Sequence, residues 1–191
     1  MFSVAAGCYT VCMNNTDDEL KRKQRAIWPE VIGVVITKSG EQVNLCPVNF
    51  QAVSTVFEKP LTVCIGLMNN SFSLETILKT GQFVYAYPAA RHLKDVLYCG
   101  SVSGRSADKI AYTAAIQFDL PLQGEVPVLK DAVANFECKL VHSYDRGDFT
   151  VVIGEIVAHQ TVGEYTLDKI YSLGGQNFGV IREVDILTDH R

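Results

Sequence analysis

The sequence predicts a mainly β fold with peripheral helices, in which about six antiparallel strands form a small barrel. Short β-branched and aromatic runs, each closed by turn residues, outnumber the helical stretches. The first two strands and the last two are each joined as hairpins, whereas a doubly wound sheet requires strands and helices to alternate. Closure into a barrel removes exposed strand edges. At 191 residues the chain is expected to form one domain, 1–191.

The N-terminal part begins with a predicted helix and a hairpin. A helix is expected from about 17 to 27, because Thr16 and Glu19 have the spacing of a capping box. From Val31 the run VIGVVITK is nearly continuous in β-branched residues, which is typical of a strand buried on both faces. A turn at 39–41 then leads into the partner strand QVNLCPVNF.

Two more strands flank a helix in the middle of the chain. The run LTVCIGL (61–67) has the pattern of a third strand. The segment SFSLETILKTG follows as a helix, with Ser71 or Ser73 as its N-cap and Gly81 just after its end. The run QFVYAYP is a fourth strand, which Pro88 stops.

The C-terminal half is expected to hold further helix and a second hairpin. Residues 91–119 are predicted to be helical with one break, and residues 120–130 are predicted to be a loop. The runs 136–143 and 149–159 are two further strands. A short helix is expected near 166–172.

Composition excludes several classes of protein. A net charge of −4 gives no support to a nucleic-acid or membrane partner. The six cysteines contain no C-x-x-C pair, so no metal site is expected and reduced thiols in a cytoplasmic protein are favoured. The apolar first 13 residues follow no positively charged stretch, and no run has the roughly 18 apolar residues of a membrane span. The charged fraction of 20% is low for a soluble domain, which indicates a surface covered by a partner subunit or a ligand.

No catalytic motif is present. The sequence lacks a G-x-G-x-x-G after a strand, a G-x-x-x-x-G-K-[ST], an H-E-x-x-H and the nucleophile elbow G-x-S-x-G. No residue is therefore predicted to be catalytic by itself. The protein either binds a ligand passively or takes its chemistry from a cofactor.

Three segments offer contacts to such a cofactor, and each also has an ordinary structural interpretation. The first runs from Asn44 to Ser54 and contains Pro47, which cannot donate to a strand ladder. Main-chain N–H and C=O groups freed by that interruption are available to a ligand. The ordinary alternative is a strand that ends in a loop.

The other two segments suit an anion. Ser71, Ser73 and Thr76 carry hydroxyls at a helix N-terminus, where unpaired amides and the helix dipole favour negative charge. Plain N-capping explains the same residues. The loop GSVSGRSADK carries Arg105, a planar fork for phosphate, and Lys109, a point charge. Salt bridges to neighbouring aspartates are the ordinary alternative for this loop.

Four longer runs occur in order along the chain: VNLCPVNFQAVSTVFEKPLTVCIGL, SFSLETILKTGQFVYAYP, CGSVSGRSADKIA and FECKLVHSYDRGDFTVVIGEIVAH. Together they resemble the flavin reductase family and, more narrowly, its flavoredoxin branch. The resemblance is collinear over about 28–160, whereas 1–27 and 161–191 carry little of it.

This resemblance implies an FMN-binding, six-stranded antiparallel Greek-key split β-barrel that forms a homodimer with the flavin near the subunit interface. It also implies electron transfer from NADH or NADPH through FMN to an acceptor. By the same resemblance, the isoalloxazine ring lies along Asn44, Leu45, Cys46, Pro47, Val48, Asn49 and Ser54. The phosphate is expected to face Ser71, Ser73 and Thr76, assisted by Ser103, Arg105 and Lys109.

One position departs from the family pattern. Many members carry Gly-Asp-His at the hairpin before the last strand, with the histidine near the nicotinamide, whereas this chain has Gly147, Asp148 and Phe149. Phe149 can stack on a flat ring but offers no hydrogen bond, and it is equally an ordinary packing residue. Two alternatives therefore stand beside an FMN-dependent oxidoreductase. One is an FMN electron carrier reduced by a partner protein, and the other is a ligand-binding barrel without flavin.

Overall fold

The computed structural model describes residues 26–54, 59–161, 168–174 and 176–181. The predicted helix at 17–27 lies outside these residues except for its last two positions, which form a turn.

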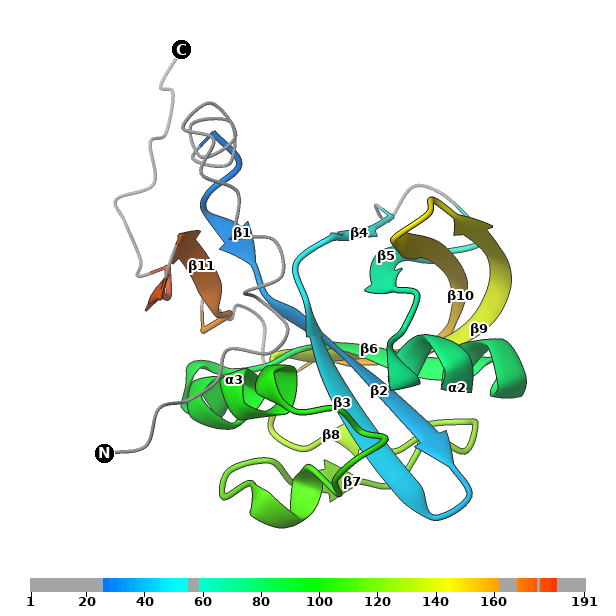
Figure 1. The fold of residues 1–191 in the computed structure, drawn as a ribbon, viewed down its shortest axis with the longest axis horizontal. Helices are drawn as coiled ribbons and strands as arrows, with labels where there is room; N and C mark the ends of the chain where they lie inside the picture. The colour runs from blue at the N-terminus through cyan, green and yellow to red at the C-terminus, as the bar shows by residue number, and fades with distance from the viewer. Residues whose placement is uncertain (1–25, 55–58, 162–167, 175, 182–191) are drawn as a thin grey trace.

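Most strands belong to one antiparallel sheet (Figure 1). Its seven strands lie in the order β3-β2-β6-β9-β10-β5-β4. In chain order they are β2 (Gly33–Ser39), β3 (Gln42–Val48), β4 (Gln51–Val53), β5 (Thr62–Met68), β6 (Gln82–Tyr87), β9 (Ala134–Asp145) and β10 (Phe149–Thr161).

Smaller elements surround this sheet. A three-stranded sheet lies on the side opposite helix α2 and contains β1 (Glu30–Val31), β11 (Tyr171–Gly174) and β12 (Asn177–Gly179). A third sheet pairs β7 (Phe118–Asp119) with β8 (Val128–Leu129). The helices are α2 (Phe72–Thr80) and α3 (Leu93–Ser101), with 3-10 turns η1 (Ala90–His92) and η2 (Ile110–Tyr112).

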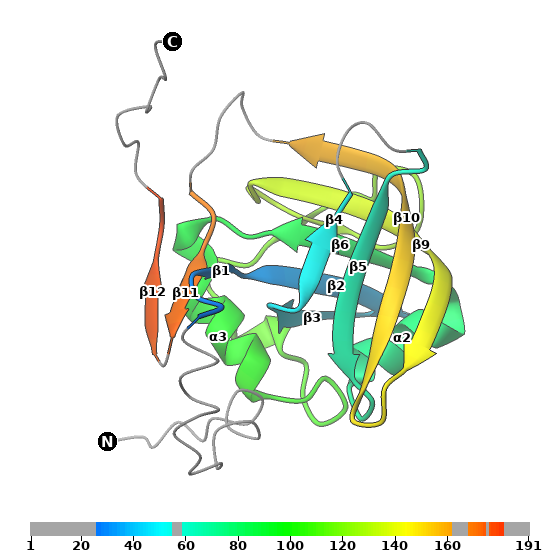
Figure 2. The same cartoon turned by 90° about the horizontal axis from the view of Figure 1, so that it is seen from above.

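The seven-stranded sheet is strongly curled. Strands β3 and β4 lie at opposite edges, although only Asn49 and Phe50 separate them in the chain. A flat sheet of seven strands would hold its edges about 29 Å apart, which is beyond the reach of two linking residues. The sheet therefore bends into a half-barrel (Figure 2). The mainly β fold is confirmed, and the extra strand is β4, which begins just beyond the end of the predicted return strand.

The curl separates two hydrophobic cores. The inner core fills the concave side and includes Val35, Ile65 and Ile77 of α2. The outer core lies between the other face of the sheet and α3, and it includes Val34 and Val96. The neighbouring residues Val34 and Val35 are both 0% exposed, so β2 is buried on both faces, as its sequence predicts.

Helix α2 has the ends that its sequence predicts. The Ser71 hydroxyl accepts the Leu74 N–H at 3.2 Å, and Gly81 follows the last turn with a φ of 70°. Both helices are short. Among the residues that the structure describes, no helix is long and apolar enough to cross a membrane.

The helical prediction for 91–119 holds only as far as Ser101, apart from the 3-10 turn at Ile110–Tyr112. Residues 113–117 are irregular, and β7 follows them. The reason is the buried carboxylate of Asp95, whose Oδ2 accepts the N–H groups of Ala114, Ala115 and Ile116. These amides bond to a side chain of α3 rather than to carbonyls one turn back along the chain.

The predicted helix near 166–172 is also absent from the described part of that range. Residues 171 and 172 pair with β1 instead, and the Ile32 N–H donates to the Ile170 carbonyl at 2.8 Å. The predicted loop 120–130 contains β8 near its end. In each case pairing with a distant segment overrides the local pattern.

Candidate functional site

Three of the predicted segments converge at the N-terminus of α2. The Asn44 Nδ2 on β3 donates to the Ser73 Oγ at 2.8 Å. The Gln42 Nε2, also on β3, donates to the Gly104 carbonyl at 2.8 Å. The structure thus joins the strand, the helix and the loop after α3. We call the resulting site the α2 cradle, which consists of Asn44, Ser71, Phe72, Ser73, Gly104 and Arg105.

The loop approaches the strand and the helix so closely that only glycine fits at position 104. A Cβ added to Gly104 would lie 2.3 Å from the Asn44 Oδ1 and 2.8 Å from the Phe72 Cδ1. Both neighbours belong to the α2 cradle, so a side chain at position 104 would force the Asn44 and Phe72 side chains to shift.

A buried amide faces this junction without being fully satisfied. Asn44 is 2% exposed, and its Oδ1 has no hydrogen-bond partner among the described residues. The Thr37 Oγ1, on the residue paired with Asn44 across β2, is likewise unpartnered within the described part of the chain. Buried polar groups are normally hydrogen-bonded, so an unpartnered pair beside a helix N-terminus indicates a place for a polar ligand.

Amide rotation lets Asn44 serve an anion. A hydroxyl both donates and accepts, so the bond to Ser73 survives a 180° turn of the Asn44 amide. The turned amide would present its N–H groups, instead of its oxygen, toward Gly104.

The first turn of α2 supplies two more donors. The Ser71 hydroxyl and carbonyl accept the N–H groups of Leu74 and Glu75, at 3.2 and 3.3 Å. The amides of Phe72 and Ser73 precede these and have no partner within the helix. Together with the helix dipole they favour a bound anion.

Arg105 brings a positive charge to the same place. Its guanidinium pairs with the Glu75 carboxylate, and its Cζ lies 5.9 Å from the centre of the Phe72 ring. Both ion-pair side chains are about half exposed, at 48% and 55%. The exposed Ser103 accepts the Arg105 N–H on its Oγ at 3.3 Å and so shapes the loop.

Two side chains that were predicted to contact the phosphate, those of Thr76 and Lys109, instead donate to backbone carbonyls of the protein. The Thr76 hydroxyl donates to the Phe72 carbonyl at 2.9 Å, within the helix. Lys109 is 5% exposed, and its Nζ donates to the carbonyls of Leu45 at 3.1 Å and Cys99 at 2.7 Å. Lys109 therefore links β3 to α3 beneath the α2 cradle.

The strand from Asn44 presents its backbone more than its side chains. Leu45 belongs to the outer core and Val48 to the inner core, and Pro47 is buried. Cys46 is half-buried against the inner core. Because β3 is an edge strand, half of its main-chain groups point away from β2 and offer contacts to a ligand.

The far end of the same segment is held by side-chain bonds. The Asn49 Nδ2 donates to the Glu30 Oε2 at 3.0 Å. The Ser54 Oγ accepts the Thr62 N–H at 2.7 Å. These contacts fix the path of the chain where it crosses from β3 to β4.

Phe149 packs on another aromatic ring. Its ring centre lies 5.6 Å from that of Phe50, in an edge-on arrangement. Phe50 in turn lies over Gly66, where a Cβ would come within 2.2 Å of the ring. The neighbouring Asp148 carbonyl accepts the Asn69 N–H at 3.0 Å, so the start of β10 is bonded to the turn that leads into α2.

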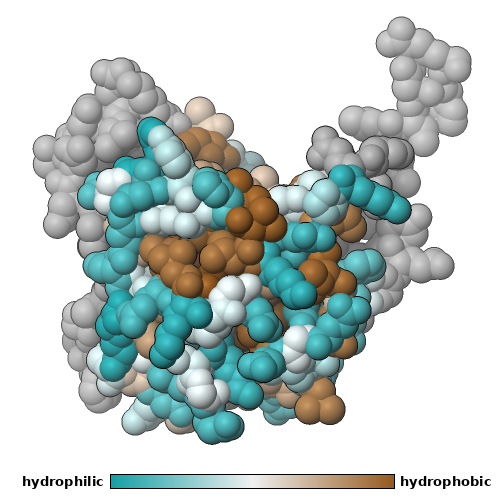
Figure 3. Space-filling model, turned by 90° about the vertical axis from the view of Figure 1, so that its right-hand side faces the viewer, coloured by the Kyte–Doolittle hydropathy of each residue, from teal (hydrophilic) through white to brown (hydrophobic). Residues whose placement is uncertain are grey.

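Phe149 also belongs to an apolar outer face of the half-barrel. Alternation along β10 and β5 places half-buried side chains on the side opposite the inner core, namely Cys64, Met68, Phe149, Val151 and Ile153. The exposed Phe50 joins them through its contact with Phe149. Figure 3 shows hydrophobic side chains gathered on the side of the molecule that carries these strands. We call this surface the outer face.

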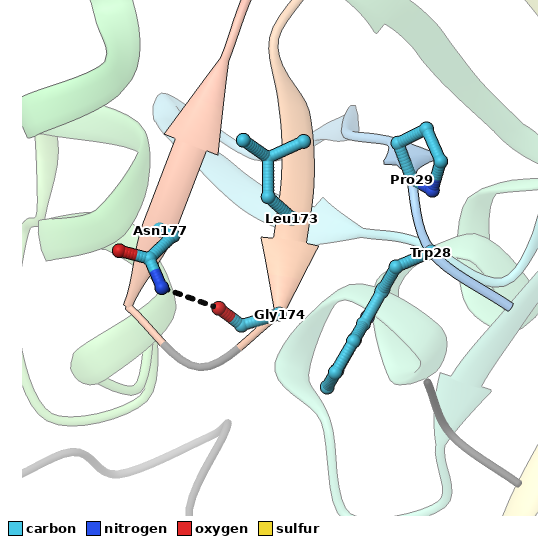
Figure 4. Close-up of a pocket in the computed structure, with 5 residues that line it drawn as sticks. All are labelled: Trp28, Pro29, Leu173, Gly174 and Asn177. Atoms are coloured by element: carbon cyan, nitrogen blue, oxygen red, sulfur yellow. Dashed lines mark hydrogen bonds between the residues drawn. The ribbon is translucent and has the colours of Figure 1, made fainter. Parts of the chain in front are cut away.

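A separate pocket was not predicted. It has a volume of about 580 Å³ and is lined by Trp28, Pro29, Leu173, Gly174 and Asn177 (Figure 4). The Asn177 Nδ2 donates to the Gly174 carbonyl at 3.3 Å. None of the predicted site residues lines it. Its two halves come from distant segments that only β1–β11 pairing brings together, so no local sequence signal exists for it.

Comparison with known proteins decides the family. Residues 26–173 match the family model described as flavin reductase like domain. The chain belongs to the flavin reductase-like family. The resemblance read from the four sequence runs is therefore confirmed, and family membership supports flavin binding and a flavin-related oxidoreductase activity.

Similar sequences and structures extend the comparison. An uncharacterized protein of Archaeoglobus fulgidus is 31% identical over 130 residues, which cover 68% of this chain and 71% of the relative. The structure of an FMN-binding protein from Thermus thermophilus has a TM-score of 0.70 at 24% identity, covering 80% and 86% of the two chains. Flavoredoxin from Methanosarcina acetivorans has a TM-score of 0.72 at 19% identity, covering 83% and 88%.

Proposed function

We propose that this protein is an FMN-dependent oxidoreductase that passes electrons from NADH or NADPH through FMN to an acceptor. The α2 cradle is the observation that carries the proposal. It combines an unsatisfied buried amide, two helix amides, a glycine that permits close approach, and an arginine. This donor set suits a phosphate monoester, which FMN has and riboflavin lacks.

Bound FMN would supply hydride acceptance and electron transfer, so the chain needs no acid–base pair of its own. The protein's part is to bind and orient the cofactor. The phosphate would be held by the amides of Phe72 and Ser73, with Asn44 and Arg105 completing the site. The exposed edge of β3 would border the ring, and Lys109 and Thr76 would hold that edge and the helix in position.

The names of two structurally similar proteins support FMN as the cofactor. The Thermus thermophilus relative is called an FMN-binding protein, and the Methanosarcina acetivorans relative is called a flavoredoxin.

The proposal is tested by the visible spectrum of the purified protein and by anaerobic addition of each nicotinamide. Flavin bands that bleach with NADH or NADPH are expected. A colourless protein that takes up no added FMN would overturn the proposal. The Gly104→Ala variant should lose FMN affinity more than riboflavin affinity, because the displaced loop carries the phosphate contacts.

Phe149 favours one second candidate, an FMN electron carrier that a partner protein reduces. Its ring packs on Phe50 and brings no hydrogen bond to a nicotinamide. Flavin bands that stay oxidised with both nicotinamides would select this carrier. In a reductase, Phe149→His should alter the KM for the nicotinamide while FMN affinity stays level.

The proposal includes a homodimer in which the outer face meets a second copy. An antiparallel sheet that faces water normally alternates apolar and polar side chains, but β5 and β10 carry apolar residues on both sides. The low charged fraction of 20% agrees with a covered surface. Phe50 and Phe149 would then lie at the interface, close to the turn that precedes α2.

A further inference from the structure

Arg105, the exposed cation of the α2 cradle, forms an ion pair with an acidic residue of α2. Glu75 lies in the first turn of α2, and its carboxylate pairs with the Arg105 guanidinium. The other nearby cation, Lys109, is buried with its Nζ on the carbonyls of Leu45 and Cys99. Arg105 is thus the cradle residue that can turn toward an incoming anion, and Glu75 already holds it.

Glu75 competes with a phosphate in two ways. It occupies guanidinium N–H groups that would otherwise bind phosphate oxygens. It also places a negative charge beside the helix N-terminus, where the dipole already stabilises it. A phosphate group that binds the Phe72 and Ser73 amides must therefore displace Glu75 from Arg105 and remain close to its carboxylate.

Exchange of partners on Arg105 is physically easy. Both side chains are about half exposed, so water screens their attraction and replaces either partner when the pair opens. The Phe72 ring, 5.9 Å from the Arg105 Cζ, can support the guanidinium in either arrangement.

We infer that Glu75 is a specificity-determining residue that weakens the capture of phosphate monoesters by holding Arg105 in a competing ion pair. The inference rests on the proposed function and deepens it: the flavin phosphate and Glu75 share one guanidinium.

The test compares FMN with riboflavin, which has no phosphate. Dissociation constants are measured by flavin fluorescence for the wild type and for Glu75→Gln. The variant should bind FMN about two- to fivefold more tightly, with riboflavin affinity unchanged. Glu125→Gln is the matched control, because this exposed glutamate is near Gln82, beyond the opposite end of α2. It should change neither constant.

A second pair of variants isolates the ion pair. In an Arg105→Gln background, Glu75→Gln should no longer tighten FMN binding, because the shared guanidinium is gone. An unchanged FMN-to-riboflavin ratio in Glu75→Gln, or an equal gain without Arg105, would overturn the inference. In both cases the proposed function is still supported if the wild type binds FMN more tightly than riboflavin. A wild type without that preference would overturn both.

Discussion

At the scale of single residues, the sequence indicates which side chains gather at the start of α2 but not which groups they bond to. Serines at a helix start and an arginine in a small-residue loop predict an anion site, and the structure brings these segments together. The bond of Thr76 to the Phe72 carbonyl is local to α2, whereas the bond of Lys109 to the Leu45 carbonyl was not predictable, because it depends on how distant segments pack. The roles of Glu75 and Gly104 were missed for the same reason. A glycine in a loop does not show which side chains a Cβ at its position would meet.

His92 gives a prediction about pH at this scale. It is 1% exposed, and its Nδ1 accepts the Ala89 N–H at 3.1 Å. Burial, together with the Arg91 charge, lowers the pKa of His92 from its usual value of 6.5. The unfolded chain therefore binds a proton that the folded chain resists, so stability should fall as the pH drops below about 6.5.

Thermal unfolding between pH 7.5 and 5 measures this effect. The His92→Gln variant keeps an acceptor but cannot titrate, so its melting temperature should fall less over the same interval. Parallel curves for the two proteins would show that His92 does not contribute to the pH dependence.

The contact between Phe50 and Phe149 gives a second residue-scale prediction. Edge-on aromatic pairs contribute about 0.5–1.5 kcal/mol beyond their buried area. A double-mutant cycle with Phe50→Leu and Phe149→Leu, followed by urea unfolding, should give a coupling free energy in that range. Additive losses in the two single variants would contradict a direct contact.

At the scale of elements, local patterns predicted α2 and the longer strands, but not the short strands or the segments whose amides bond to buried acids. The caps of α2 are local, so Ser71 and Gly81 could be identified from spacing alone. The stretch 113–117 looked helical because nothing in it reveals the Asp95 carboxylate that accepts its amides.

Glu137 holds a second loop in the same manner and carries an element-scale prediction. This buried carboxylate on β9 accepts the N–H groups of Leu122, Gln123 and Gly124. Glu137→Gln should lower the free energy of unfolding by about 1–3 kcal/mol, because an amide offers only one accepting oxygen.

Hydrogen exchange locates that loss. The three amides at 122–124 should exchange faster in Glu137→Gln, while amides of α2 keep their rates. Equal acceleration throughout the chain would indicate a general loss of stability rather than release of this loop.

For the whole molecule, the sequence predicted a closed β architecture but not how it closes. Hairpins were visible because their partners are adjacent in the chain. The pairing of β1 with β11 joins segments that no local pattern relates. Local patterns also do not show that β3 and β4, which follow each other in the chain, lie at opposite edges of the sheet. The pocket beside Trp28 depends on such pairing and was missed with it.

The proposed homodimer gives the prediction at this scale. Light scattering at micromolar concentration should report twice the 21.1 kDa of one chain. Val151→Lys puts a charge on a half-buried position of the outer face on β10, and it should shift the protein toward the monomer.

Leu120→Lys is the matched control for assembly, since Leu120 is 85% exposed in the loop after β7. It should leave the mass unchanged. A wild type that scatters as a monomer and still retains FMN would contradict an interfacial cofactor.

The strand order also determines when the chain becomes able to bind during its synthesis. The neighbours β3, β2 and β6, together with α2 and α3, all lie within residues 33–101 and leave the ribosome as one stretch. The β4–β5 hairpin joins the rest of the sheet only through β10, which is made last of the seven strands. The parts of the α2 cradle are therefore translated before the half-barrel can close, and cofactor supplied during translation meets them in a nascent chain.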